Sequence, residues 1–305
     1  MELSGRIKNE IETIAIKALG AEKSEIEKVT VMKEGMTNQS FLIFFRGKKY
    51  ILRIPGIGTD LLVNRKAEAA VYQEIGNKGI CDNVVYINFE NGCKITEYFE
   101  DARVCNSQCK DDVQKCMEKL RAMHKMRLQV GHEFDLFKQI EFYELLLRKN
   151  GLLSQYKDYE ETKENVIRLK RYIDRQTKDK VLAHIDAVPD NFLFVKNEKG
   201  IEEVRIIDWE YAGMQDPHID IAMFGIYSDY SRQQMEWLIE TYFQTGCSDT
   251  VKMKIYCYIA ACGLLWSNWC EYKRSMGVEF GEYASHQYRY AKEYYQVVKD
   301  EWEKG

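Results

Sequence analysis

Apolar residues in the N-terminal third of the chain recur first with the period of a helix and then with the period of a strand. Over residues 1–20, Ile7, Ile11 and Ile14 fall on one side at helical spacing, which predicts an amphipathic helix. A second helical pattern covers residues 61–75. The strand patterns, rich in β-branched and aromatic residues, cover residues 29–32, 41–45, 50–54, 84–87 and 94–98. These segments predict a small antiparallel sheet of about five strands.

Beyond this sheet the apolar pattern is mainly helical. Helices are predicted over residues 107–126, 142–148, 157–178, 235–243, 249–271 and 279–302. The exception is 181–195, where two short apolar runs flank polar residues, and a Gly-containing turn sequence then leads to a third apolar run, 206–210. Strands joined in this way predict a hairpin. We therefore expect an α+β fold of two lobes, with a β-rich lobe over residues 1–97 and a larger, mainly helical lobe over residues 98–305.

Composition and charge exclude several classes of protein. The chain has 305 residues, of which 45% are hydrophobic and 30% charged, as is typical of a globular protein with a large core. The formal net charge is -4 and no long run of Lys or Arg occurs, so nucleic acid is not an expected partner. The N-terminus lacks the apolar core of a signal peptide, and no segment is apolar enough to span a membrane. We expect a cytoplasmic protein that does not insert into membranes.

The predicted hairpin carries the residues with the clearest chemistry. His184, Asp186 and Asn191 form the pattern H-x-D-x-x-x-x-N, and Asp208 follows the third apolar run. A hairpin brings Asp186, Asn191 and Asp208 to one end of a rigid unit, as an oxygen-rich cluster. In such a cluster, Asp186 can accept the proton of a reacting hydroxyl group. Asn191 and Asp208 can bind a Mg²⁺ ion that bridges nucleotide phosphates. His184 is expected to fix the loop backbone, and Asp220 further on to brace the same loop.

Residues of the predicted sheet provide candidates for binding a nucleotide. The turn between the first two strands is rich in polar side chains that can fold over phosphates: Thr37, Asn38, Gln39 and Ser40. Arg53 ends the third strand pattern and Glu68 lies in the following helix, which matches the phosphate-gripping cation and its acidic partner in protein kinases. Glu97 and Tyr98 begin the connector to the helical lobe, whose backbone groups can meet a purine edge. The alternatives are an ordinary hairpin turn, a surface Arg and a solvated Glu.

Taken together, the segments HIDAVPDNFLF and IIDWEYAGMQDPHIDIA resemble the aminoglycoside phosphotransferase/choline kinase superfamily, and the likeness extends over nearly the whole chain. The D-W-E-Y-A-G run looks most like bacterial choline kinases. The resemblance implies a protein-kinase-like fold, Asp186 as the base, Asn191 and Asp208 on magnesium, and Arg53 with Glu68 on ATP. The chain has H-I-D and D-W-E where protein kinases have H-R-D and D-F-G, which points away from a protein substrate.

A pair of tryptophans bears on the substrate. Trp266 and Trp269 are three residues apart and share a helix face. A quaternary ammonium has positive charge but no hydrogen-bond donor, so aromatic rings are its natural receptor. Choline kinases have a similar W-x-x-W in their choline pocket, and Tyr211 matches another aromatic residue of that pocket. The resemblance therefore implies transfer of phosphate from ATP to choline; the alternative is that both Trp residues pack the core.

Other activities stay open at this level. An aminoglycoside phosphotransferase needs carboxylates for a polycationic substrate, and the C-terminal third offers Glu271, Glu279, Glu282 and Glu293. Ethanolamine needs a carboxylate such as Asp229 or Glu210 for its primary ammonium, and Glu210 is therefore a candidate substrate-binding residue. A non-catalytic, ligand-binding pseudokinase is the alternative from another class. The sequence does not specify an oligomeric state.

Overall fold

The computed structural model describes residues 5–20, 22–34, 38–56 and 59–302, and it divides the chain into two compact units. The first unit consists of Met1–Val104 and Leu193–Tyr211, and the second of Cys105–Phe192 and Ala212–Gly305. The polar motif of the sequence is therefore divided between them. A boundary near residue 97 between lobes of different function stays a prediction.

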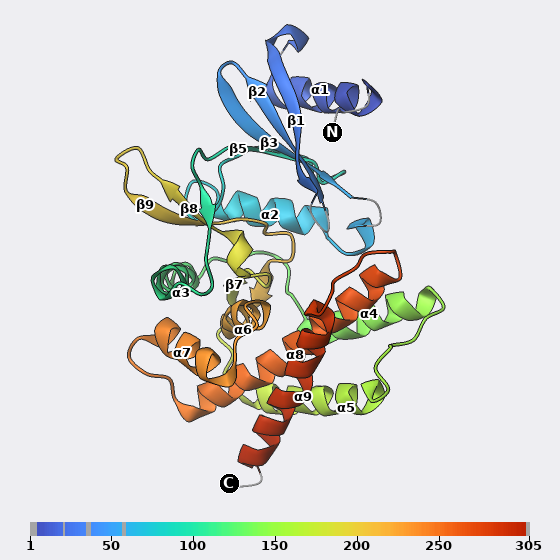
Figure 1. Cartoon of the computed structure of the whole chain (residues 1–305). Coiled ribbons are helices and arrows are strands. Elements are labelled where there is room, and N and C mark those ends of the chain that lie inside the picture. The colour runs from blue at the N-terminus through green and yellow to red at the C-terminus, as the bar shows by residue number, and fades with distance from the viewer. Residues whose placement is uncertain (1–4, 21, 35–37, 57–58, 303–305) are drawn as a thin grey trace. The chain divides into compact units, whose positions relative to one another are not determined.

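The first unit is built on the predicted five-stranded sheet. Its strands run antiparallel in the order β1-β2-β3-β5-β4. Figure 1 shows them as a twisted layer in blue and green. The strands are β1 (Ile26–Glu34), β2 (Asn38–Phe45), β3 (Lys48–Pro55), β4 (Val84–Ile87) and β5 (Lys94–Glu97).

A helix covers each face of this sheet. Ile11 and Ala15 of α1 (Gly5–Leu19) pack in the same core cluster as Leu52 on β3. Because side chains alternate along a strand, the neighbouring Arg53 points to the opposite face. There it meets α2 (Arg65–Ile75), which begins later than predicted. Its start is set by Asn64, whose side chain accepts a hydrogen bond from the third residue of the helix at 3.1 Å.

The predicted hairpin is present, with a partner for its first strand that the sequence did not reveal. β8 (Phe192–Lys196) and β9 (Glu202–Ile206) are neighbours in a sheet with β6 (Arg103–Val104). The earlier apolar run forms β7 (Val181–Ala183), which pairs antiparallel with β10 (Gly213–Gln215) in the second unit. The polar residues His184 to Asn191 therefore form a loop between two sheets.

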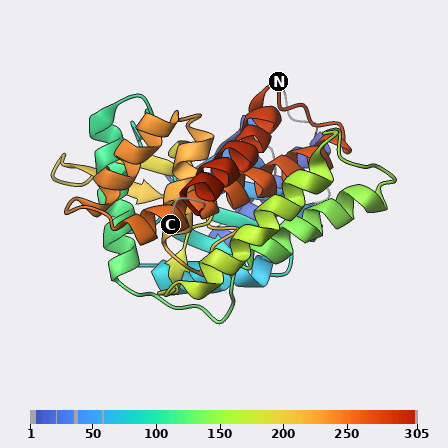
Figure 2. The same cartoon turned by 90° about the horizontal axis from the view of Figure 1, so that it is seen from below.

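Helices make up the rest of the second unit. They are α3 (Lys110–Lys125), α4 (Leu136–Lys149), α5 (Tyr159–Arg175), α6 (His218–Tyr227), α7 (Arg232–Phe243), α8 (Asp249–Arg274) and α9 (Tyr283–Trp302). Figures 1 and 2 show α8 and α9 side by side, and α8 also packs against α4, α5 and α6. In the part of the chain that the structure describes, no helix combines the length and hydropathy that a bilayer crossing requires.

The central position of α8 depends on one close approach. A Cβ atom at Gly263 would lie 2.6 Å from the carbonyl oxygen of Gln287 and 2.9 Å from the backbone nitrogen of Ala291, both on α9. Backbone atoms cannot move aside as a flexible side chain can, so only glycine allows the two helices to pack this closely. This contact holds the segment of α8 that bears the predicted Trp pair.

Candidate functional site

A buried aspartate holds the loop that follows β7. Asp220 on α6 accepts hydrogen bonds from the backbone N–H groups of His184 and Ile185, both at 2.8 Å, and lies 2.9 Å from Nε2 of His124. Ile185 has a φ of 70°, a left-handed conformation that costs a β-branched residue on the order of 1–3 kcal/mol. The two bonds to Asp220 stabilise that conformation, so its predicted bracing role is confirmed. His184 is fully buried beside this turn, and its own role stays a prediction.

Asp186 and Asn191 are in direct contact in the second unit. The side-chain nitrogen of Asn191 donates to the main-chain oxygen of Asp186 at 2.9 Å and to its Oδ2 at 3.2 Å. A short 3₁₀ turn at Pro189–Asn191 folds the chain back and makes this contact possible. Because the amide nitrogen is engaged, the amide oxygen is the atom that Asn191 can offer to a cation. Asp208 belongs to the first unit, so its meeting with these two residues stays a prediction.

Two tyrosines that the sequence did not single out lie near Asp186. The ring centroids of Tyr227 and Tyr283 are 5.7 Å apart, and the Tyr227 hydroxyl donates to Asp190 at 2.8 Å. Burial raises the pKa of Tyr283, and the negative charge of Asp186 adds to the rise. The pKa of Tyr227 is raised by burial, by Asp190 and by Asp186. Both phenols therefore stay neutral and offer aromatic surface close to the carboxylate; the Tyr-rich last helix was the single sequence signal for Tyr283.

Trp266 and Trp269 lie in the buried part of α8. Their ring centroids are 5.6 Å apart, and the Trp269 ring is 5.3 Å from that of Phe280. Nε1 of Trp266 donates to Sδ of Met223 at 2.7 Å, and the two indoles are only 5% and 3% exposed. Burial is expected both for core packing and for an enclosed aromatic box, so the role of the pair in binding choline stays a prediction. Tyr211, the third predicted aromatic residue, is also buried but belongs to the first unit.

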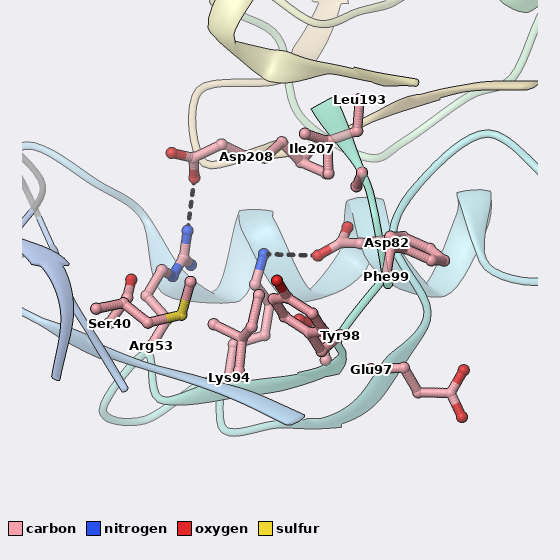
Figure 3. Close-up of a pocket in the computed structure, with 14 residues that line it drawn as sticks. Ser40, Arg53, Asp82, Lys94, Glu97, Tyr98, Phe99, Leu193, Ile207 and Asp208 are labelled. Carbon is pink, nitrogen blue, oxygen red and sulfur yellow. Dashed lines mark hydrogen bonds and ion pairs between the residues drawn. The ribbon is translucent and has the colours of Figure 1, made fainter. Parts of the chain in front are cut away.

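The first unit contains a cavity of about 390 Å³, and all of its lining residues belong to that unit. Figure 3 shows the side chains that line it, which come from the sheet, from the connector after β5 and from the segment after β9. Residues that the sequence predicted at scattered positions line this one cavity: Ser40, Arg53, Glu97, Tyr98 and Asp208. Their convergence supports the idea of a single nucleotide site.

Arg53 is the centre of a buried ion cluster at this cavity. One guanidinium nitrogen is hydrogen bonded to Glu68 on α2, and Nη1 donates to Oδ1 of Asp208 at 2.6 Å, the contact drawn in Figure 3. The pairing of Arg53 with Glu68 matches the geometry that the sequence predicted. The additional contact with Asp208 ties the cation on β3 to the candidate metal ligand. Asp208 itself has a φ of 64°, so strained backbone occurs at this carboxylate as well as beside Asp186.

A second cation, missed in the sequence, lies beside Arg53. Lys94 on β5 is the cross-strand partner of Arg53, and its side chain is almost fully buried. Its Nζ is hydrogen bonded to the Tyr72 hydroxyl, 3.6 Å from Asp82 and 3.8 Å from Glu68. Figure 3 shows Lys94 and Asp82 reaching toward each other across the cavity. The available signal was a lysine at the first position of a short strand, Lys94–Glu97, and strand periodicity alone does not distinguish it from an exposed one.

The side chain of Glu210 is buried, whereas that of Asp208, two residues earlier, is partly exposed to solvent. Its carboxylate accepts a hydrogen bond from Nδ2 of Asn38 at 3.1 Å and lies 3.5 Å from both Arg53 and Arg65. The side chain of Glu210 is 2% exposed, against 31% for Asp208. Burial, together with the charge of Asp208, raises the pKa of Glu210 to about 7.

The remaining predicted residues have varied surroundings. Thr37 lies outside the described residues, and Gln39 is exposed on β2. The backbone N–H groups of Glu97 and Tyr98 already donate to carbonyl oxygens within the unit, at 2.9 and 3.0 Å. A purine would therefore meet this connector through its carbonyl oxygens and side chains. In Figure 3 the Glu97 side chain points away from the other labelled groups.

Comparison with known proteins identifies the family to which this site belongs. Residues 29–292 match the family model described as choline/ethanolamine kinase. The chain belongs to the choline/ethanolamine kinase family. It is accordingly a small-molecule kinase, and the superfamily inferred from its sequence motifs is confirmed.

Individual relatives of this kinase agree with that assignment. Protein LicA of Haemophilus influenzae is 28% identical over 268 residues, covering 82% of this chain and 75% of that protein. The crystal structure of choline kinase LicA from Streptococcus pneumoniae aligns with a TM-score of 0.80 at 28% identity, covering 96% of this chain and 100% of that one. A structure of LicA in complex with AMP aligns at 0.77 with 28% identity, over 95% and 98% of the two chains. The predicted kinase-like α+β fold, with an antiparallel β lobe and a larger helical lobe, is confirmed.

Proposed function

We propose that this kinase transfers the γ-phosphoryl group of ATP to the hydroxyl group of choline. In this reaction the hydroxyl oxygen forms a bond to phosphorus while the bond between phosphorus and the β,γ-bridging oxygen breaks. The hydroxyl proton passes to Asp186, and ADP and phosphocholine are the products. The observation that carries the proposal is the Asp186–Asn191 contact on a loop braced by Asp220, because it orients a carboxylate and an amide oxygen at one place.

The cavity of the first unit suits the nucleotide. Arg53 and Lys94 supply two cations for phosphate oxygens, and Glu68 keeps Arg53 in place. Tyr98, with its carbonyl-bearing connector, offers a surface for the purine. The bound AMP named in the LicA structure supports a nucleotide site in this fold.

We also propose that Asn191 and Asp208 hold a magnesium ion, because the chemistry of each donor suits one. Asn191 offers an amide oxygen, and Asp208 a carboxylate whose side chain is 31% exposed. Hard oxygen donors of this kind are the ligands that Mg²⁺ prefers, with water and phosphate oxygens completing its shell. When bound, the ion would neutralise negative charge on the phosphates. The protein's own part is to orient Asn191 through Asp186 and to hold Asp208 against Arg53.

Choline is favoured over ethanolamine by the state of the carboxylates that a primary ammonium would need. Glu210 is enclosed by Arg53 and Arg65, and Asp229 lies 2.8 Å from Arg289 and 3.2 Å from a histidine. Both are thus already partnered by basic groups. The rings near Asp186, those of Tyr227 and Tyr283, and the predicted pair Trp266–Trp269 on α8 remain as the receptor for the cation. Rings of this kind each contribute on the order of 0.5–2 kcal/mol to binding a quaternary ammonium.

A coupled ADP-release assay tests the proposal. The purified kinase is assayed with ATP and Mg²⁺ against choline, ethanolamine, an aminoglycoside and methylthioribose. We expect choline to have the highest kcat/KM. A higher kcat/KM for ethanolamine would overturn the assignment of the acceptor, and turnover of none of the four would support a non-catalytic, ligand-binding role.

A further inference from the structure

We propose that Glu210 is a positioning residue of the nucleotide site: through Asn38 it holds the start of β2, which carries Ser40 of the cavity lining, beside Arg53. The inference deepens the proposed function and rests on it for the identity of the nucleotide. It assigns Glu210 to the nucleotide rather than to the ammonium group of an acceptor.

The contacts of Glu210 link four segments that are distant in sequence. Its Oε2 accepts the hydrogen bond from Asn38 at the first residue of β2. The same oxygen lies 3.5 Å from Nη1 of Arg53 on β3 and 3.5 Å from Nη1 of Arg65 on α2. Glu210 itself follows β9. One carboxylate therefore fixes the start of β2 relative to β3 and α2, beside the predicted phosphate site.

Glu210 is presented from a rigid platform. The preceding residue, Trp209, is fully buried, and its Nε1 donates to the main-chain oxygen of Ile206 at 2.8 Å. This bond closes the segment from Ile206, at the end of β9, to Trp209, the residue before Glu210. A carboxylate on such a segment can hold Asn38 in position, whereas a carboxylate on a mobile loop would move together with Asn38.

The burial of the two neighbouring carboxylates separates their roles. Asp208 keeps 31% of its side chain exposed and can take an external ligand, whereas Glu210 keeps 2%. An ammonium ion could reach Glu210 only by displacing Arg53 or Arg65, each of which carries its own charge. Replacing a buried Arg side chain by a hydrated substrate ammonium would lose the fixed geometry of the ion pair, and the positive charge beside Glu210 would not increase. Glu210 is therefore closed to a substrate amine.

The position of Asn38 explains the expected effect on the nucleotide. It is the cross-strand partner of Pro55 and directly follows the turn that the sequence assigns to the phosphates. Backbone N–H groups bind phosphate only when they are aimed at it, and the bond to Glu210 sets where this strand begins. Loss of the bond should weaken nucleotide binding and leave recognition of the acceptor alcohol unchanged.

A double-mutant cycle tests this. Glu210→Ala, Asn38→Ala and the double variant are compared by calorimetry for binding of a non-hydrolysable ATP analogue with Mg²⁺, with no acceptor present. We expect each single variant to raise Kd roughly tenfold, and the double variant no more than the weaker-binding single, since all three lose the same contact. Asn9→Ala, at an exposed asparagine on α1 of the same unit, is the matched control and should bind as the wild type does.

Further measurements separate this role from three others. Glu210→Gln keeps an acceptor oxygen for Asn38 and should bind within about threefold of the wild type, which a purely structural defect or a required charge would not allow. The Asn38→Ala variant leaves the buried charges paired, so it provides a test even if Glu210→Ala fails to fold. Both Ala variants should also raise the Kd of ADP when EDTA removes the metal ion. If Kd were then unchanged, Glu210 would act through the metal ion, and the inference would be overturned.

The test of Glu210 does not depend on which acceptor the kinase uses, because it measures binding of the nucleotide. Multiplicative effects in the cycle, or a raised choline KM with unchanged nucleotide Kd, would refute the role of Glu210. Absence of choline turnover in the wild type, together with a non-additive binding cycle, would instead refute the proposed function and leave the role of Glu210 intact.

Discussion

Asn191 donates its side-chain amide to Asp186 at two points, 2.9 Å from the main-chain oxygen and 3.2 Å from Oδ2. The first bond fixes the backbone of the loop and the second orients the carboxylate. Asn191 can therefore do two things at once, because its nitrogen positions the proposed base, Asp186, while its oxygen stays suited to a metal ion. This explains in physical terms why an asparagine, rather than an aspartate, follows Asp186 at this spacing.

Asp186→Asn should remove the proton acceptor and leave the shape of the loop intact. We expect kcat to fall by roughly 10²–10⁴, the range that a positioned general base contributes. Binding of the nucleotide, measured by calorimetry without acceptor, should change little, because Asp186 is not one of the residues that line the cavity. Turnover near that of the wild type would show that another group accepts the proton.

Asp220→Ala should destabilise the protein and impair turnover together. The substitution leaves two buried backbone N–H groups, those of His184 and Ile185, without their acceptor. Each such group costs about 1–3 kcal/mol, so the free energy of unfolding should fall by roughly 2–6 kcal/mol. Urea denaturation measures the loss, and kcat is measured well below the new midpoint. Full activity in the folded variant would show that the left-handed turn at Ile185 does not need this brace.

Trp266→Leu and Trp269→Leu distinguish an aromatic box from a packed core. If the rings receive a quaternary ammonium, the choline KM should rise roughly tenfold for each variant, with the ATP KM nearly unchanged. Steady-state kinetics with each substrate varied in turn gives both values. Trp237→Leu on α7 is the control for loss of an indole. Parallel changes in both KM values, or a fall in the melting temperature alone, would favour core packing.

Lys94→Met tests the cation that the sequence left unnoticed. Removing this buried charge from the cavity should raise the Kd of the ATP analogue by about tenfold or more, because hydrogen bonds from a cation to phosphate are worth about 1.5–3 kcal/mol. Calorimetry provides the measurement, and Lys48→Met, exposed on β3, is the matched control. Unchanged affinity would limit Lys94 to balancing Asp82 and Glu68.

The buried pair of Asp216 and Lys254, 2.6 Å apart, should make stability depend on acidity. Burial alone would raise the pKa of Asp216, but its hydrogen bond with His218 and the charge of Lys254 lower it from 3.8 to about 2. A lowered folded-state pKa means that this stabilisation is complete above pH 3.8 and is lost as the pH falls toward 2. It amounts to about 2 kcal/mol.

Lys254→Met therefore has a pH-dependent cost. At pH 7 it should destabilise the protein by roughly 3–5 kcal/mol, because it leaves a buried carboxylate without its cation. The difference from the wild type should shrink as Asp216 becomes protonated. Urea midpoints from neutral pH down to about pH 3 measure this, with Lys252→Met on the same helix as control. A difference that stays constant with pH would contradict the assignment to Asp216.

The elements and several site residues follow from local sequence, because their signals lie within a few positions of each other. Strand alternation predicted the five-stranded sheet, and a cation on one strand followed by an acid on the next helix predicted the pairing of Arg53 with Glu68. These local patterns did not predict the role of Lys94, because that role depends on its position opposite Arg53 in the strand register. Register is set by pairing between strands that are far apart in the chain, and no local pattern encodes it.

By itself, the sequence determined the order of elements, the Asp186–Asn191 spacing and the family, all of which depend on short-range periodicity and on motifs read in order. The tertiary structure decided the roles of residues with identical chemistry. Asp208 and Glu210 are both acidic and two positions apart, yet one is open and the other enclosed by Arg53, Arg65 and Asn38. The physical reason is that burial and charge partners come from segments brought together only by folding, and these determine what a carboxylate can bind.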